Sequence, residues 1–255
     1  MRFESVMKHQ FLYLFWIVLI SFHVKAQDSI IDQDIKVNQQ LWLDYNFKNN
    51  IDSLKVLNTQ IGFRKISPNV FNRFLVLSHI NLPHKKSLGI VNLEKPFIES
   101  FMLGAGIIYT QNYDADDNLE FRLSQGFKFS IPTLKGIDLI NYVRLEERFQ
   151  NTFNNSGWTA GYRLRYRIST ELNWKKHVVK FTNGLYIPMS FEMFLNLKKS
   201  DRFNDLVRIS PGLGYKFKND WKFELYLIFN ETKNNTETNN SSSDFILRIR
   251  VYNGT

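Results

Sequence analysis

The chain has 255 residues, a formal net charge of +9 and no cysteine. The lack of cysteine excludes a disulfide framework, a thiolate metal ligand and a cysteine nucleophile. A basic chain can bind nucleic acid, but many of the arginines alternate with aromatic residues instead of clustering on one helix or tail, so we expect no nucleic-acid partner.

The first 26 residues have the pattern of a cleavable signal peptide. Arg2 and Lys8 supply positive charge, residues 11–22 are almost wholly apolar, and residues 24–26 match a signal-peptidase site, which predicts cleavage after Ala26. An uncleaved anchor is the alternative, but the apolar run is shorter than the roughly 20 residues that a spanning helix needs. The chain is therefore expected to be exported.

Residues 27–255 are predicted to form one domain, an all-β fold that closes into an antiparallel transmembrane barrel. Residues 27–37 read as a short polar lead, and charged or amide residues interrupt every later apolar run, so no later segment is expected to span a membrane as a helix. A chain that lies in lipid without spanning helices has to satisfy its backbone hydrogen bonds in a closed barrel.

Residues 158–169 show the expected strand pattern most clearly, because successive side chains on a strand point to opposite faces. One face is apolar and the other is charged, as a wall between lipid and lumen requires. The apolar face would carry Trp158, Ala160, Tyr162, Leu164, Tyr166 and Ile168, and the charged face Thr159, Gly161, Arg163, Arg165, Arg167 and Ser169.

The same alternation predicts about twelve strands, most of them as long as the roughly 9–11 residues that a membrane-crossing strand needs. The fourth has the weakest contrast between its faces, and ten strands is the fallback. Bacterial barrels normally keep both termini in the periplasm, which an even number of strands satisfies. The expected strands cover residues 38–47, 55–66, 70–81, 86–94, 99–112, 118–131, 137–150, 158–172, 177–194, 202–217, 221–231 and 243–252.

Tight periplasmic turns and longer outer loops should alternate along such a chain. Residues 112–117, 150–157 and 231–242 are polar and poor in apolar residues, which predicts outer loops. The expected tight turns are rich in turn-forming residues and lie at 67–69, 95–98, 132–136, 173–176 and 218–220.

The charged face of each strand is expected to turn inward, because a charge at the bilayer midplane costs roughly 2–4 kcal/mol in barrels. Aromatic residues are expected at the two membrane interfaces. Asp44 and Glu120 belong to the acidic part of the lining, and Glu146 should face the arginines of residues 163–167. The predicted lumen-lining charged residues are Arg64, Arg122, Arg144, Glu146, Arg148, Arg163, Arg165, Arg167, Glu192, Arg208, Glu224, Arg248 and Arg250.

Two interpretations fit this lining. The simpler one is a salt-bridged filling that supports the barrel, and the other is an anion-favouring constriction or a site for an anionic ligand. Barrels of about eight strands are filled by side chains, whereas those of 16–18 leave an aqueous channel. About twelve strands with many long arginines inside therefore predict a narrow or closed lumen.

No catalytic, metal or cofactor site is expected. His79 is next to Ser78, but the two lie on opposite faces of a strand and no third group is seen to orient a relay. Asp114, Asp116 and Asp117 lack the glycine and the terminal glutamate of a calcium loop, so a solvated loop is expected there.

Four segments carry a resemblance to a known family. Residues 141–149 (NYVRLEERF) resemble the "RLEQRF"-like strand of the domain-of-unknown-function 2490 group, an uncharacterised family of outer-membrane β-barrels, and so do residues 40–45 (QLWLDY) and 191–196 (FEMFLN). Residues 211–217 (PGLGYKF) are similar to its "GLGYKF" strand. The resemblance covers essentially the whole mature chain. It implies an outer-membrane location in a Gram-negative bacterium of the Bacteroidota type, and it brings no known activity.

We therefore expect an outer-membrane protein with a structural role or a narrow, anion-favouring pore for small solutes, and not an enzyme. The alternative is a surface- or ligand-binding barrel that acts through its extracellular loops, and the third candidate is an outer-membrane lipid-modifying enzyme. The expected partners are outer-membrane lipid, the barrel-assembly machinery and small anionic solutes.

Overall fold

The computed structural model describes ten stretches of the chain. The predicted signal peptide, residues 1–26, and the predicted start of the barrel domain at residue 27 lie outside the described residues. The described residues are 37–52, 55–67, 71–83, 98–113, 115–132, 137–154, 157–173, 184–197, 205–233 and 241–253.

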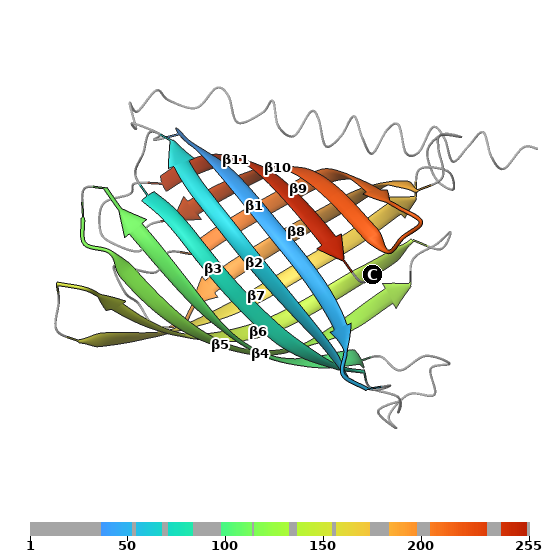
Figure 1. Cartoon of the computed structure of the whole chain (residues 1–255), viewed down its shortest axis with the longest axis horizontal. Helices are drawn as coiled ribbons and strands as arrows, with labels where there is room; N and C mark the ends of the chain where they lie inside the picture. The colour runs from blue at the N-terminus through green and yellow to red at the C-terminus, as the bar shows by residue number, and fades with distance from the viewer. Residues whose placement is uncertain are drawn as a thin grey trace, which may run out of the picture. The chain divides into compact units, whose positions relative to one another are not determined.

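Eleven β-strands form the described wall and close into one barrel. Consecutive strands pair antiparallel, and β1 pairs in parallel with β11 to complete the ring. Figure 1 shows the strands inclined to the barrel axis, with β1 in blue beside β11 in red. The strands are β1 (Val37–Asn50), β2 (Val56–Ser67), β3 (Phe71–Pro83), β4 (Ile98–Asn112), β5 (Asn118–Pro132), β6 (Asp138–Thr152), β7 (Trp158–Asn173), β8 (Leu185–Asn196), β9 (Asp205–Lys216), β10 (Trp221–Lys233) and β11 (Ser241–Asn253).

The predicted fold class, an all-β closed barrel, is confirmed, and the wall has eleven strands where the sequence predicted about twelve. The predicted fourth strand, residues 86–94, lies outside the described residues. β3 pairs directly with β4 along its whole length. The described wall therefore has no strand between these two.

An odd number of strands places the two ends of the wall at opposite ends of the barrel. Val37 at the start of β1 is level with Ser243 of β11, and Phe47 is level with Asn253 at the end of β11. Each antiparallel connection reverses the chain, and eleven strands leave the last one running in the same direction as the first. The two chain termini, which the sequence predicted to lie on one side, fall outside the described residues, so this remains a prediction.

The predicted contrast between tight turns and longer loops is absent from the middle of the chain. Residues 113–117 join β4 to β5, residues 133–137 join β5 to β6, and residues 153–157 join β6 to β7, so the three connections have the same length. The first of them is closed by a hydrogen bond of 3.0 Å, which the backbone amide of Asn112 donates to the carboxylate of Asp117.

Side chains alternate between a buried and an exposed position along each strand. On β1, Trp42 and Asp44 are 3% and 4% exposed, whereas Leu43 and Tyr45 are 39% and 37% exposed. The Arg208 guanidinium of β9 lies 4.9 Å from the centroid of the Trp42 ring, although β9 and β1 are not neighbours. This contact crosses the barrel, so the buried face is the interior.

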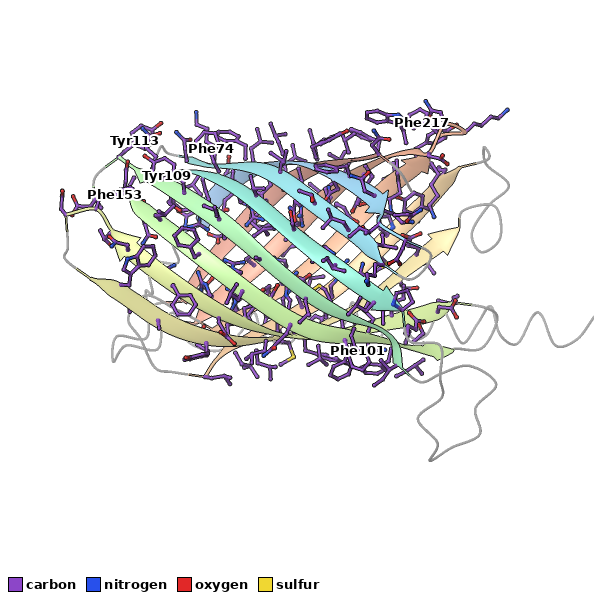
Figure 2. The ribbon with its side chains drawn as sticks, turned by 60° about the horizontal axis from the view of Figure 1, so that its bottom comes forward. Phe74, Phe101, Tyr109, Tyr113, Phe153 and Phe217 are labelled. Atoms are coloured by element: carbon purple, nitrogen blue, oxygen red, sulfur yellow. The ribbon has the colours of Figure 1, made fainter. Side chains whose placement is uncertain are left out.

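The outer face carries exposed apolar and aromatic side chains on nearly every strand (Figure 2). Several of the rings contact one another, as Phe121 does with Trp158 at 5.4 Å between centroids. Glu147 is an exception, because its register partners Leu123 and Tyr162 place it on this face. No helix among the described residues has the length and apolarity needed to cross a bilayer.

Candidate functional site

The structure places every predicted lumen-lining residue on the inner face. Directly paired residues of neighbouring strands share a face, and Glu146 pairs with Arg163 while Glu192 pairs with Arg208. The complete set on this face is Arg64, Arg122, Arg144, Glu146, Arg148, Arg163, Arg165, Arg167, Glu192, Arg208, Glu224, Arg248 and Arg250.

Glu146 of β6 is the centre of the charged interior. Its side chain is fully buried, and it forms a close ion pair with Arg163 of β7 and a second one of 2.6 Å with Arg144. Arg122 and Arg165 complete the ring at 3.9 Å and 3.8 Å. One carboxylate thus serves four guanidinium groups from three strands, and this sharing leaves net positive charge around it.

Glu192 of β8 forms a second centre that is joined to the first. Arg165 bridges the two, because its Nη2 lies 2.6 Å from Glu192 while its Nη1 is within ion-pair distance of Glu146. Arg208 and Arg167 contact the same carboxylate at 3.1 Å and 3.5 Å. The ionic network therefore runs continuously from β5 to β9.

Glu120 of β5 extends the network at one side. It lies 2.6 Å from both Arg122 and Arg148, and it accepts a hydrogen bond of 2.7 Å from the amide of Gln150. Because Arg122 also faces Glu146, Glu120 belongs to the same connected lattice. Its placement inside agrees with its sequence pattern.

The remaining two buried carboxylates lie at or next to the seam where β1 meets β11. Asp44 pairs with Arg248 at 2.5 Å and accepts a hydrogen bond of 2.7 Å from Gln60. Glu224 lies 3.1 Å from Lys222 and 3.8 Å from Arg250.

Several aromatic rings lie inside the barrel, and Trp42 and Phe194 are two that were not predicted there. Trp42 has the Arg64 guanidinium 3.9 Å from its ring centroid, and Arg208 and Arg248 lie near the same ring. Phe194 is likewise contacted by Arg208 at 4.9 Å. Aromatic residues were expected at the membrane interfaces. Trp42 and Phe194 are each two residues from an inward carboxylate, Asp44 and Glu192, and residues two apart on a strand share a face, so both rings lie inside.

Cations outnumber anions on the described inner face. Five buried carboxylates lie there, Asp44, Glu120, Glu146, Glu192 and Glu224, against the predicted arginines and the unpredicted Arg73. Several buried guanidinium Nε atoms have no hydrogen-bond partner among the described residues, which leaves donors free for anions or water. These Nε atoms belong to Arg64, Arg144, Arg165, Arg167 and Arg250.

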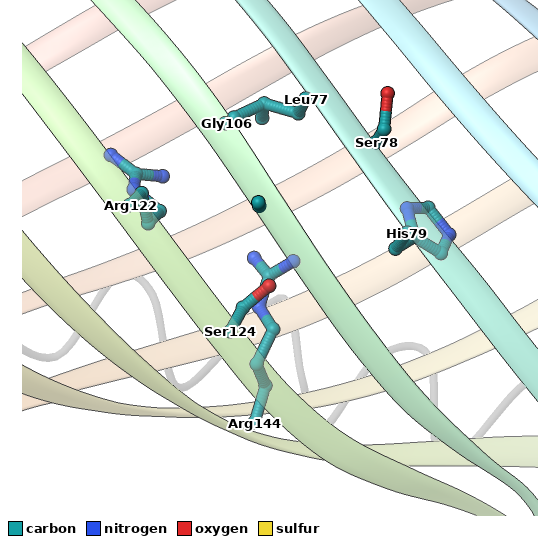
Figure 3. A pocket seen from close by; sticks show the side chains of 8 residues that line it. Leu77, Ser78, His79, Gly106, Arg122, Ser124 and Arg144 are labelled. Carbon is teal, nitrogen blue, oxygen red and sulfur yellow. The ribbon is translucent and has the colours of Figure 1, made fainter.

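A small cavity of about 20 Å³ adjoins this network on the inner side of β3 to β6 (Figure 3). It is lined by Arg122 and Ser124 of β5, Arg144 of β6, and His79 of β3, together with the small residues of β4. No carboxylate lines it among the described residues.

The described residues weighed for catalysis and metal binding are not assembled into such sites, and Asp114 lies outside the described residues. Ser78 lies on the outer face, where its hydroxyl is 2.9 Å from that of Thr59, while His79 lies on the inner face. Asp117 is used by its own loop, as an acceptor for Asn112. Across the described stretches, no group of three or more metal-ligating side chains is present. The loop at 234–240, central to the surface-binding alternative, lies outside the described residues.

Comparison with known proteins gives one match. The sequence model of the family described as "Protein of unknown function (DUF2490)" matches residues 39–241, which is most of the barrel wall. No curated protein and no solved structure matches the chain.

Proposed function

The chain belongs to the DUF2490 family, and from this premise and the charged interior we propose that it is an integral outer-membrane barrel whose lumen favours small anions. The excess of inward-facing arginines over buried carboxylates is the observation that carries the proposal. Outer-membrane lipid and the barrel-assembly machinery are its proposed partners, and we assign the interior no catalytic role.

The outer face supports a membrane location. Large apolar side chains such as Leu103, Leu123 and Leu227 are each about half exposed, and a continuous apolar surface of this kind is rare on a soluble monomer. The strands have 12 to 16 residues, which exceeds the roughly 9–11 that a tilted strand needs to cross a bilayer. The predicted signal peptide is consistent with export.

The inner face supports a preference for anions. A lumen lined with fixed positive charge lowers the energy of an anion and raises that of a cation. Arg64 and Arg73 contribute most directly, since neither is within 4 Å of a carboxylate among the described residues. Their charge is therefore less neutralised by the protein than that of the arginines around Glu146.

The packing of the interior sets the size of the solute. The arginines around Glu146 and Glu192 are largely buried against one another and against Phe194. Ions that pass this level have to be small and at least partly dehydrated, which predicts a low conductance.

Single-channel recording in a planar bilayer under a KCl gradient tests the proposal. We expect small current steps and a reversal potential with the sign of chloride permeation. Arg64→Gln and Arg73→Gln should each move the reversal potential toward zero. Lys65→Gln is the matched control, because Lys65 is exposed and its register partner Leu41 places it on the outer face. Cation selectivity, or no current at any voltage, would refute the pore.

A further inference from the structure

We infer that the cavity lined by His79, Arg122, Ser124 and Arg144 binds a single monatomic anion, a halide such as chloride. This inference goes beyond a conducting lumen, because a halide held there as an exchangeable counter-ion would satisfy the same contacts in a barrel that passes no current.

Glycine creates the space for the ion. A Cβ atom at Gly104 would lie 2.8 Å from the hydroxyl oxygen of Ser124, and one at Gly106 would lie 2.2 Å from a methyl carbon of Leu77. Any larger residue at these two inward positions would push into the cavity or its lining. The cavity of about 20 Å³ has room for one small particle such as a halide.

The lining offers donors that the protein itself leaves unused. The Nε atom of Arg144 is buried and has no hydrogen-bond partner among the described residues. His79 and Ser124 make no side-chain hydrogen bond within the described part of the chain. Figure 3 shows the guanidinium of Arg144 and the hydroxyl of Ser124 directed toward the same space. Buried donors without partners are destabilising, so a bound acceptor stabilises this region.

Charge decides between an anion and a water molecule. Two of the lining residues, Arg122 and Arg144, are cations. Arg144 pairs with Glu146 and Arg122 pairs with Glu120, and each of these carboxylates is shared with a further arginine, Arg163 for Glu146 and Arg148 for Glu120. A halide accepts hydrogen bonds as water does and also offsets part of this unneutralised charge. A metal cation would be repelled by the positive charge of the two guanidinium groups.

Crystals of the purified protein soaked in sodium bromide provide the direct test. We expect an anomalous peak in contact with Arg144 and Ser124. In solution, the bromide NMR line should broaden on adding the detergent-refolded protein, because bound and free bromide exchange. Arg144→Gln should weaken binding about tenfold, the loss expected for one hydrogen bond to a charged group.

The matched control is Arg167→Gln, which removes an inner arginine that contacts Glu192 and does not line the cavity. A second variant without a charge change, Ser124→Val, should abolish binding by filling the space, with Ser190→Val as its control on the same face. Heat-dependent gel mobility reports whether each variant folds. If Arg144→Gln does not fold, the comparison of Ser124→Val with Ser190→Val tests the inference.

Bromide peaks found only at other guanidinium groups would mean an adventitious ion only and would overturn the inference. Equal weakening of bromide binding by Arg144→Gln and Arg167→Gln would overturn it as well. The result is separable from that of the pore. Bromide binding without anion-selective current would support the halide site and refute the pore. Anion-selective current without bromide binding would support the pore and refute the halide site.

Discussion

Arg64 of β2 and Arg73 of β3 lie directly opposite one another on the inner face, and neither has a carboxylate within 4 Å among the described residues. Arg64 stacks on Trp42, and the Nε of Arg73 donates a hydrogen bond of 2.9 Å to Thr110. Like charges facing each other across two strands are destabilising, and salt screens them.

The first prediction concerns this pair. Raising the salt concentration should increase the free energy of unfolding of the native protein more than that of Arg73→Gln, because the variant has lost the repulsion that salt screens. Urea unfolding in detergent at two concentrations of sodium fluoride measures both. An identical salt dependence in the two proteins would show that the guanidinium groups do not repel each other.

The second prediction uses two adjacent glutamates with opposite surroundings. Glu146→Gln should destabilise the barrel by about 3–5 kcal/mol, because it leaves buried guanidinium groups without their shared carboxylate. Glu147→Gln is the control, since this side chain lies on the outer face beside Leu123. Its effect should be near zero or stabilising. Equal urea midpoints for the two variants would contradict the assignment of the faces.

The third prediction tests the proposed contact with lipid. Leu227 lies at the middle of β10 on the outer face and is 59% exposed, whereas Phe217 lies in the connection that precedes β10. Leu227→Arg should cost about 2–4 kcal/mol in a bilayer and reduce the amount of protein in the membrane fraction. Phe217→Arg should be tolerated. Normal membrane recovery of Leu227→Arg would argue against burial of this face in hydrocarbon.

The fourth prediction tests the parallel seam. The chain has no cysteine, so an introduced pair reports on one contact only. Leu41 and Leu247 are register partners on the outer face, and their replacement by cysteine should give a disulfide under mild oxidation. Cysteines at Leu41 and Val251 share the face but lie four residues apart in register, so they should remain reduced. Cross-linking of the second pair in preference to the first would overturn the pairing of β1 with β11.

The sequence predicted the faces of the wall well because a strand has a period of two. Once Arg163, Arg165 and Arg167 are assigned inward, the alternation decides the side of every other residue of β7. The same rule placed Glu146 and Glu192 inside. These assignments need no knowledge of which strands are neighbours.

The number of strands and the composition of the centre were harder to predict. Residues 86–94 have little contrast between their faces, and parity alone cannot decide whether they belong to the wall. Glu146 is shared by four arginines because of the register between β5, β6 and β7. This register cannot be read from the sequence of any one strand. Trp42 and Phe194 were missed because their residue type suggested a membrane interface while their spacing indicated the interior.

The seam between β1 and β11 also determines the order of events during assembly. Asn38 and Asp244, which are hydrogen-bonded at 3.0 Å across it, are 206 positions apart, so no short turn can nucleate this pairing. Every other pair of neighbouring strands is consecutive in the chain and can form as a hairpin. The barrel can close only after the last strand has been made and lies beside the first. Until then β1 and β11 are edge strands with unpaired backbone groups, and the open sheet can pair with the edge of a second copy and aggregate.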